Sequence, residues 1–166
     1  VNNQKIAYRE LGEGNSDIPL VMLVHLAATM DDWDPKLLDL LAERQHLIVM
    51  DLPGVASSEG SVATTIPGMA HQAAEIIQAL GYQKVNLLGL SMGGMIAQEV
   101  VRAYPALINR LVLVGTGPRG GAGIDVVTGT TFGYMARAAR EKISPKRYIF
   151  YTHDAQGGIE AQRVLD

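Results

Sequence analysis

The sequence predicts an α/β fold in which a mostly parallel sheet is covered by helices on both faces. Short apolar runs alternate along the chain with longer segments of helical periodicity. A run that is apolar at every position is typical of a strand buried on both faces, and strands separated by helices usually pair in parallel. With 166 residues, 48% of them hydrophobic and 19% charged, the chain can bury the core of one domain or most of one.

Five segments are expected to form strands because they are short and dominated by apolar residues. In chain order they are 6–11, 20–24, 46–50, 85–88 and 111–114. The last of these is expected to be buried like the others.

Helices are expected between these strands. The first begins at Asp34 and Pro35, since an N-cap aspartate followed by proline is a common helix start, and four leucines between 37 and 41 are expected to form its buried side. The second covers 67–80, where apolar or small residues recur at helical spacing. The third covers 92–104 and stops at a proline.

The pattern changes near residue 118. Residues 115–133 are rich in glycine and threonine and show no periodicity. Beyond them we expect short helices over 132–141, 145–151 and 159–165. We therefore expect residues 1–118 to be the N-terminal part of the core and residues 119–166 to be a partial helical cap or lid.

The stretch Gly89–Gly94 contains a G-x-S-x-G motif between the predicted strand 85–88 and the predicted helix 92–104. Glycines in that place allow the sharp turn that lifts a serine hydroxyl above a sheet. Ser91 is therefore the candidate catalytic nucleophile.

Acyl transfer by serine also needs donors for the oxyanion. The backbone N–H of Met92, at the start of the helix, is the first candidate. The second donor in such sites comes from the loop after an early strand, which here is 25–28, and the N–H of Ala27 is our choice. Ser91, Met92 and Ala27 form the predicted site.

Three motifs together resemble the α/β-hydrolase fold family over about residues 4–118. They are His25-Leu26-Ala27-Ala28 at the oxyanion loop, the D-x-P-G-type loop 51–58, and the elbow at Gly89–Gly94. The phrases 31–35 and 93–99 are similar to the branch of small esterases, enol-lactonases and cofactor-free haloperoxidases. The resemblance implies a small acyl substrate, no cofactor, and a supporting role for His25 in orienting the oxyanion loop.

Two positions depart from the family pattern. Leu26 stands where the family often has glycine, which limits backbone freedom beside the second oxyanion donor. Ala56 replaces another usual glycine, with an expected effect on packing more than on chemistry.

The family places the triad acid and histidine after the serine. The only histidine after Ser91 is His153, which we interpret as a surface or cap residue. His46 and His71 are expected to be packing or surface residues. Because serine without a base is a poor nucleophile, the chain alone is expected to be close to inactive.

Three explanations of the incomplete triad compete. The chain is a C-terminally truncated fragment of a longer hydrolase, which we favour, or a complete but degenerate protein, or one whose missing strands come from a second chain. Loss of later strands would leave 111–114 as an unpaired edge, so we expect a homodimer or aggregation through that edge.

Other chemistries are not indicated. The net charge of −3 and the absence of cysteine argue against nucleic-acid binding, disulfides and thiolate sites, and suit the cytoplasm. No apolar run approaches the length of a membrane span, so no membrane association is expected.

Two further patterns have simpler interpretations. Gly115–Gly120 matches G-x-G-x-x-G, but Pro118 argues against the helix that a dinucleotide site needs, and a flexible hinge is expected. Asp31 and Asp32 are expected to be solvated and Asp34 to be a helix cap, so no metal site is predicted.

The sequence therefore predicts a serine hydrolase acting on a small ester, lactone or related acyl substrate. The alternative is a non-catalytic binding or interaction protein that retains the fold. A perhydrolase or haloperoxidase activity would use the same triad and stays open.

Overall fold

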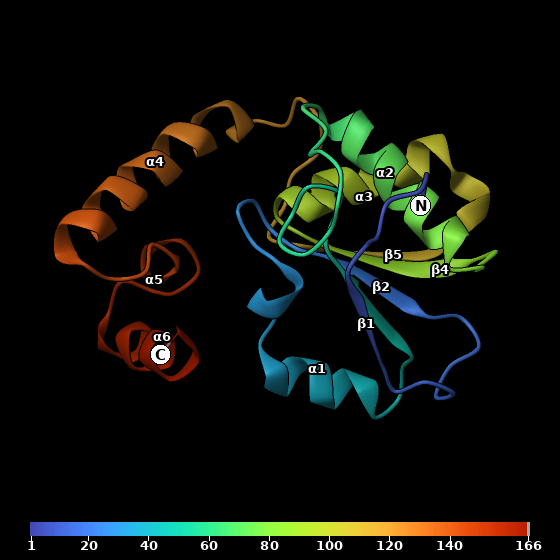
Figure 1. Cartoon of the computed structure of the whole chain (residues 1–166). Coiled ribbons are helices and arrows are strands. Elements are labelled where there is room, and N and C mark those ends of the chain that lie inside the picture. The colour runs from blue at the N-terminus through green and yellow to red at the C-terminus, as the bar shows by residue number, and fades with distance from the viewer. Residues whose placement is uncertain (166) are drawn as a thin grey trace. The chain divides into compact units, whose positions relative to one another are not determined.

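The computed structural model describes residues 1–165 and divides into two compact units, Val1–Arg119 and Gly120–Asp166, of which the final residue is not described (Figure 1).

The first unit is built on a five-stranded sheet with the order β1-β3-β2-β4-β5. The strands are β1 (Tyr8–Leu11), β2 (Leu20–Leu23), β3 (Leu47–Met50), β4 (Val85–Leu90) and β5 (Ile108–Val114). β1 pairs antiparallel with β3, and the other neighbours pair in parallel. The expected mostly parallel sheet is confirmed.

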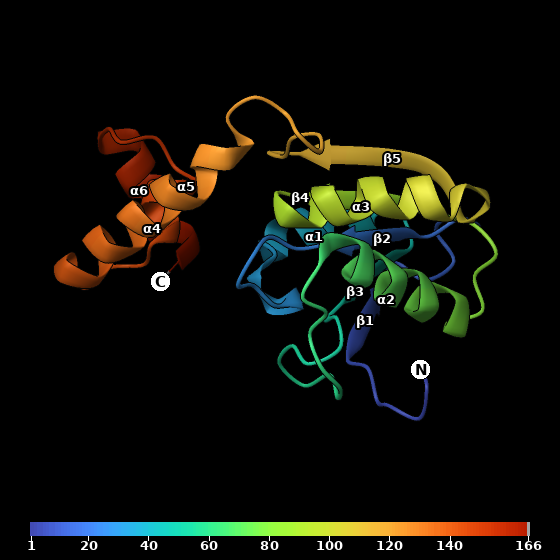
Figure 2. The same cartoon turned by 90° about the horizontal axis from the view of Figure 1, so that it is seen from above.

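Helices cover both faces of this sheet. In Figures 1 and 2, α2 and α3 lie on one face and α1 on the other. The first unit contains η1 (Met30–Asp32), α1 (Pro35–Ala42), α2 (Ile66–Ala79), α3 (Met92–Ala103) and η2 (Pro105–Leu107). Asp34 caps α1 by accepting a hydrogen bond from the Lys36 N–H, as predicted.

Alternate residues of the strands supply two cores. Val21 and Ile48 pack with α2 and α3, whereas Leu20 and Leu47, one position away, pack with Trp33 and α1. Successive side chains of a strand point to opposite faces, so an uninterrupted apolar strand fills both cores at once.

The helix α1 buries less than its leucines predict. Leu38 is buried and Leu41 is half-buried, but Leu37 and Leu40 are exposed. A helix turns only one stripe toward a sheet, and residues 37 and 40 lie off that stripe.

β5 is the outer strand of the described sheet, and the prediction that it is buried is wrong. Val112, Leu113 and Val114 are 42–44% exposed. The strand begins three residues earlier than predicted, at Ile108, and no described strand pairs with its outer edge.

The second unit consists of α4 (Ile124–Glu141), α5 (Lys146–Ile149) and α6 (Ala155–Leu165). α4 begins eight residues earlier than the predicted helix at 132, inside the segment that was expected to be irregular. Its glycines, threonines and valines have low helix propensity, so the sequence pattern does not reveal the helix. No proline lies between 119 and 144, so nothing in the backbone prevents a helix there.

An aromatic cluster holds α4 and α5 together. The rings of Tyr134 and Tyr148 stack with centroids 5.9 Å apart, and His153 meets both rings edge-on. The Arg137 guanidinium lies 4.4 Å from the Tyr148 ring centroid and pairs with Glu141 at 2.9 Å.

Candidate functional site

Ser91 occupies a sharp turn between β4 and α3. Its backbone has φ 55° and ψ −117°, a strained conformation for a residue with a side chain. The Ser91 N–H donates to the carbonyl of Val114 at 2.9 Å, and the Ser91 carbonyl accepts from the N–H groups of Gly94 and Met95. The surrounding backbone therefore holds the serine in a conformation that it would not adopt alone.

The glycines of this turn are required by close contacts with neighbouring backbone and side-chain atoms. A Cβ on Gly89 would lie 2.4 Å from the Gly93 carbonyl oxygen, and one on Gly93 would lie 2.2 Å from the Leu23 oxygen. A Cβ on Gly94 would lie 2.5 Å from the Thr116 methyl group. The helix α3 can thus start directly against β2 and β4 only because these side chains are absent.

The loop after β2 carries the second predicted oxyanion donor. Ala27 has a left-handed backbone with φ 57°, whereas Leu26 is not among the residues with positive φ. The leucine in place of the family's glycine therefore imposes no strain of its own, and the strained position is the next one. The His25 Nδ1 lies 2.8 Å from the Leu26 carbonyl oxygen, inside the same loop.

Ala27 and Met92 line one cavity of about 400 Å³, together with His25 and Asp51. That volume suits a small organic ligand. Ser91 immediately precedes Met92, which is the first residue of α3 and so has no carbonyl within the helix for its N–H to bond. The structure thus brings the two predicted donors to the same cavity.

A buried carboxylate anchors the segment that follows the Ala27 loop. Asp51 is 1% exposed, and its Oδ1 accepts from the Met30 N–H at 2.7 Å. The Ser58 hydroxyl donates to the Asp51 carbonyl at 2.8 Å and accepts from the Ala7 N–H at 2.9 Å. The D-x-P-G-type loop is thereby tied to the residue before β1 and to the start of η1, which follows the Ala27 loop.

Burial raises the pKa of the Asp51 carboxyl above its ordinary value. The hydrogen bond from Met30 lowers that pKa in part, and the nearby Asp31 charge raises it further. Folding therefore disfavours the ionised form of the Asp51 carboxyl, compared with the unfolded chain.

Ala56 shows why the family has glycine at that position. Its φ is 45°, in the left-handed region that favours glycine. The alanine therefore adopts a backbone conformation that favours glycine, and its expected effect on packing stays a prediction.

His46, His71 and His153 each make contacts of their own with other residues. His46 is buried, with its ring edge-on to Tyr82 at 6.0 Å. The His71 Nδ1 contacts the Tyr104 hydroxyl, and the His153 Nε2 lies 3.0 Å from the Tyr148 carbonyl oxygen.

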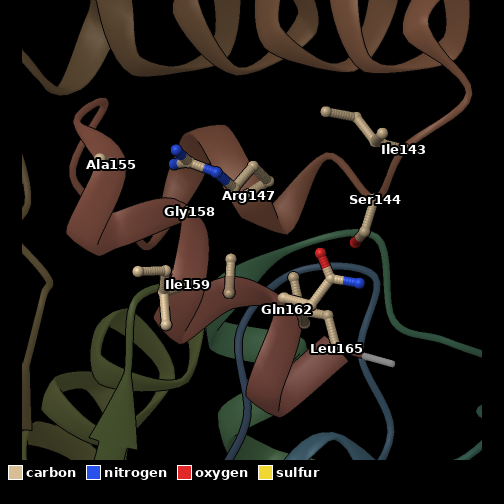
Figure 3. A pocket seen from close by; sticks show the side chains of 9 residues that line it. Ile143, Ser144, Arg147, Ala155, Gly158, Ile159, Gln162 and Leu165 are labelled. Atoms are coloured by element: carbon tan, nitrogen blue, oxygen red, sulfur yellow. The ribbon is translucent and has the colours of Figure 1, made fainter.

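The second unit has a larger cavity of about 520 Å³, lined by residues between Ile143 and Leu165 (Figure 3). The Arg147 guanidinium at its wall donates to the carbonyls of Thr152 and Asp154, and the Ser144 hydroxyl accepts from the Lys146 N–H. These polar groups stabilise local turns and show no nucleophile paired with a base. The smaller cavity, which Ala27 and Met92 line, is therefore the better candidate site.

Within residues 1–165, no three or more histidine or acidic side chains group in a way that could hold a metal ion. In the same range, no helix is both long and apolar enough to cross a bilayer.

The sequence profile described as alpha/beta hydrolase fold matches residues 19–146. The chain belongs to the alpha/beta hydrolase fold family. The predicted resemblance is thus confirmed, and the matched range includes both the Ala27 loop and the Ser91 turn.

Individual members of the family are similar over different lengths. The alpha/beta hydrolase fold protein from Chitinophaga pinensis superimposes with a TM-score of 0.88 and 32% identity, covering 99% of this chain and 58% of that one. A putative carbamate hydrolase RutD from Pantoea ananatis is 31% identical over 64% of this chain and 40% of its own. The pimeloyl-[acyl-carrier protein] methyl ester esterase of Pectobacterium carotovorum is 31% identical over 64% and 39%.

The chain therefore spans about 40% of the length of these two curated hydrolases. These similarities establish hydrolase relatives for the chain. They leave the substrate open, because the putative carbamate hydrolase and the methyl ester esterase are equally similar to this chain.

Sequence reasoning did not single out two residues beside the site. Ser58 belongs to the D-x-P-G-type loop, and its position at the end of that motif could have drawn attention to it. Gln98 in α3 donates its side-chain N–H to the carbonyls of Gly94 and Gly117. It gives no comparable signal in the sequence, because a polar residue within an amphipathic helix is ordinarily solvated.

Replacement of Gly93 by alanine should destabilise the protein by about 3 kcal/mol or more. The new Cβ would lie 2.2 Å from the Leu23 carbonyl oxygen, and the Leu23 backbone is held in β2 by its pairing with β4. Urea unfolding followed by circular dichroism measures the loss.

Gly133→Ala is the matched control. Gly133 lies in α4, and a Cβ there meets no atom within 4 Å, so alanine should stabilise the helix by about 0.5–1 kcal/mol. Equal effects of the two substitutions would contradict the close contact at Gly93.

Asp51→Ala should lower the free energy of unfolding by about 1–3 kcal/mol, because the buried Met30 N–H loses its acceptor. Asp51→Asn keeps an acceptor and removes the charge. Since the folded-state pKa is raised, the wild type loses stability as pH rises from about 4 through that pKa, and the asparagine variant does not.

The measurement is urea unfolding of the wild type and Asp51→Asn between pH 4 and pH 7. The asparagine variant should gain relative stability as pH rises. Asp39→Asn, on the exposed side of α1, serves as the control for a general charge effect. A pH-independent difference between wild type and Asp51→Asn would show that burial does not perturb this carboxyl.

Proposed function

We propose that this chain carries the nucleophile and oxyanion hole of a serine hydrolase that acts on a small ester, lactone or related acyl substrate. One observation carries the proposal. Ser91 is held in a strained turn at a helix start, and the neighbouring Met92 shares a cavity with Ala27. Strain of this kind persists at functional sites because the surrounding structure enforces it.

In the proposed reaction, the Ser91 Oγ attacks the substrate carbonyl carbon while a base accepts the hydroxyl proton. The carbonyl oxygen becomes an oxyanion, which the N–H groups of Met92 and Ala27 stabilise. The bond to the leaving group then breaks, the base returns the proton to that group, and water hydrolyses the acyl-enzyme. Each donor in such a hole contributes roughly 3–4 kcal/mol to transition-state stabilisation.

His25 supports this arrangement in the proposal and does not take the proton. Its Nδ1 approaches the Leu26 carbonyl, within the loop that presents Ala27. The base and its acid partner are proposed to come from sequence beyond residue 166, following the family order of serine, acid and histidine. The chain of 166 residues alone should then have little activity.

The alternative is a binding protein that retains the fold without chemistry. It is favoured by the position of His153, which packs against Tyr134 and Tyr148. A perhydrolase or haloperoxidase would share the Ser91 machinery, so assays with peroxide, halide and ester substrates must distinguish these activities.

A fluorophosphonate probe applied to the full-length protein should label Ser91, because the activated Oγ displaces fluoride from phosphorus. Ser91→Ala should abolish labelling, as judged by intact mass and peptide mapping. Ser57→Ala, which alters an exposed serine outside the site, is the matched control and should label like the wild type. Absence of labelling in the full-length wild type would reject the enzyme hypothesis and favour the binding protein.

The 166-residue chain should self-associate through the outer edge of β5. Val112, Leu113 and Val114 are exposed there, and an uncovered strand edge can pair with another. Light scattering should show dimers or larger species, and Val112→Lys should reduce them.

Leu40→Lys is the control for this test, since Leu40 is equally apolar and exposed but lies on α1. A clean monomer for the unmodified chain across the concentration range would contradict self-association.

A further inference from the structure

The segment that leaves β5, which we call the exit segment (residues 115–119), lies against the first turns of α3. The Thr116 side chain fills the space that a Gly94 side chain would need, with its methyl group 2.5 Å from the ideal Cβ position. One residue before the exit segment, the Val114 carbonyl accepts the Ser91 N–H. The position of this segment and the conformation of Ser91 are therefore directly connected.

Gln98 ties the exit segment to the helix. Its side-chain Nε2 donates to the Gly94 carbonyl at 3.1 Å and to the Gly117 carbonyl at 3.1 Å. Gln98 lies four residues after Gly94 and seven after Ser91, so all three share one helix face. A single amide thus joins the first turn of α3 to the chain leaving β5.

A second contact lies beside this one and is weaker. The Glu99 carboxylate, whose side chain is 10% exposed, pairs with Arg102 at 2.6 Å and with Arg119 at 3.6 Å. Arg119 is 87% exposed, so water screens its interaction. The part-buried amide of Gln98 is therefore the main polar tie between α3 and the exit segment.

We propose that Gln98 is a positioning residue for Ser91, an inference that rests on the proposed function of Ser91 as nucleophile. Ser91 has a strained backbone, and such a conformation is kept only where neighbouring atoms restrain it. The Val114 carbonyl and the Thr116 side chain supply that restraint. Gln98 holds the exit segment, which contains Thr116 and directly follows Val114. Loss of the tie lets Ser91 drift from the attacking geometry, while the cavity beside Ala27 stays intact.

The inactivation kinetics of the full-length protein with a fluorophosphonate test this role. Gln98→Met keeps the length and most of the volume of the side chain but removes the donor. The first-order inactivation constant should fall about 10- to 100-fold, since small misplacements of a reacting group have effects of that size. The inhibition constant for the probe should change little.

Gln98→Glu provides a second readout that a purely structural role would not move. At neutral pH the carboxylate cannot donate and repels both carbonyl oxygens, whereas the protonated acid can donate to one of them. The inactivation rate of Gln98→Glu relative to wild type should therefore rise as pH falls. A ratio of these two rates that does not change with pH would overturn the proposal. This test also holds if Gln98→Met fails to fold.

Gln78→Met and Gln78→Glu are the matched controls, because Gln78 lies on the exposed side of α2. Both should inactivate like the wild type at every pH. If the wild type labels and Gln98→Met labels at the same rate, the positioning role is wrong and the proposed function stands.

Amide hydrogen exchange separates the two proposals when the wild type does not label. In Gln98→Met, peptides covering 89–95 and 115–119 should exchange faster than in Gln78→Met. Unchanged exchange would overturn the tie itself. Faster exchange without any wild-type labelling would support the tie and reject the serine hydrolase.

Discussion

The contact between the Gly93 backbone and the Leu23 carbonyl is the constraint on which the rest of the first unit depends. It sets how closely α3 approaches β2 and β4, and with that the height of Ser91 above the sheet. Any side chain at this point would push the helix outward, widen the turn and separate Met92 from the loop that carries Ala27. The geometry of the site is thus a consequence of backbone packing, and the apolar cores on the two sheet faces keep that packing in place.

The second requirement is that the loops that follow β2 and β3 stay together beside this turn. Asp51 connects them by accepting a hydrogen bond from the Met30 N–H. Its carboxyl loses solvation by this burial, which is why its pKa is raised. Gln98 makes a similar connection between α3 and the exit segment after β5. In both cases one polar side chain joins two segments by a hydrogen bond to a backbone group.

Most of the first unit could be predicted from its sequence because strand and helix periods are local properties. The apolar runs at 20–24 and 46–50 and the motif at Ser91 predict the strands and the turn correctly. The errors occur where local preference and context diverge. Residues 124–131 are helical despite weak propensity, and β5 is an outer strand because burial depends on neighbours that a sequence pattern does not reveal.

By itself the sequence determined the sheet, the turn at Ser91 and membership of the alpha/beta hydrolase fold family. These follow from residue types at fixed short spacings, which local backbone geometry translates directly. Only the tertiary structure decided that Ala27 and Met92 face one cavity, that Asp51 holds Met30, and that Gln98 reaches Gly117. Such contacts join residues far apart in the chain, and their distances depend on how the strands and helices pack together.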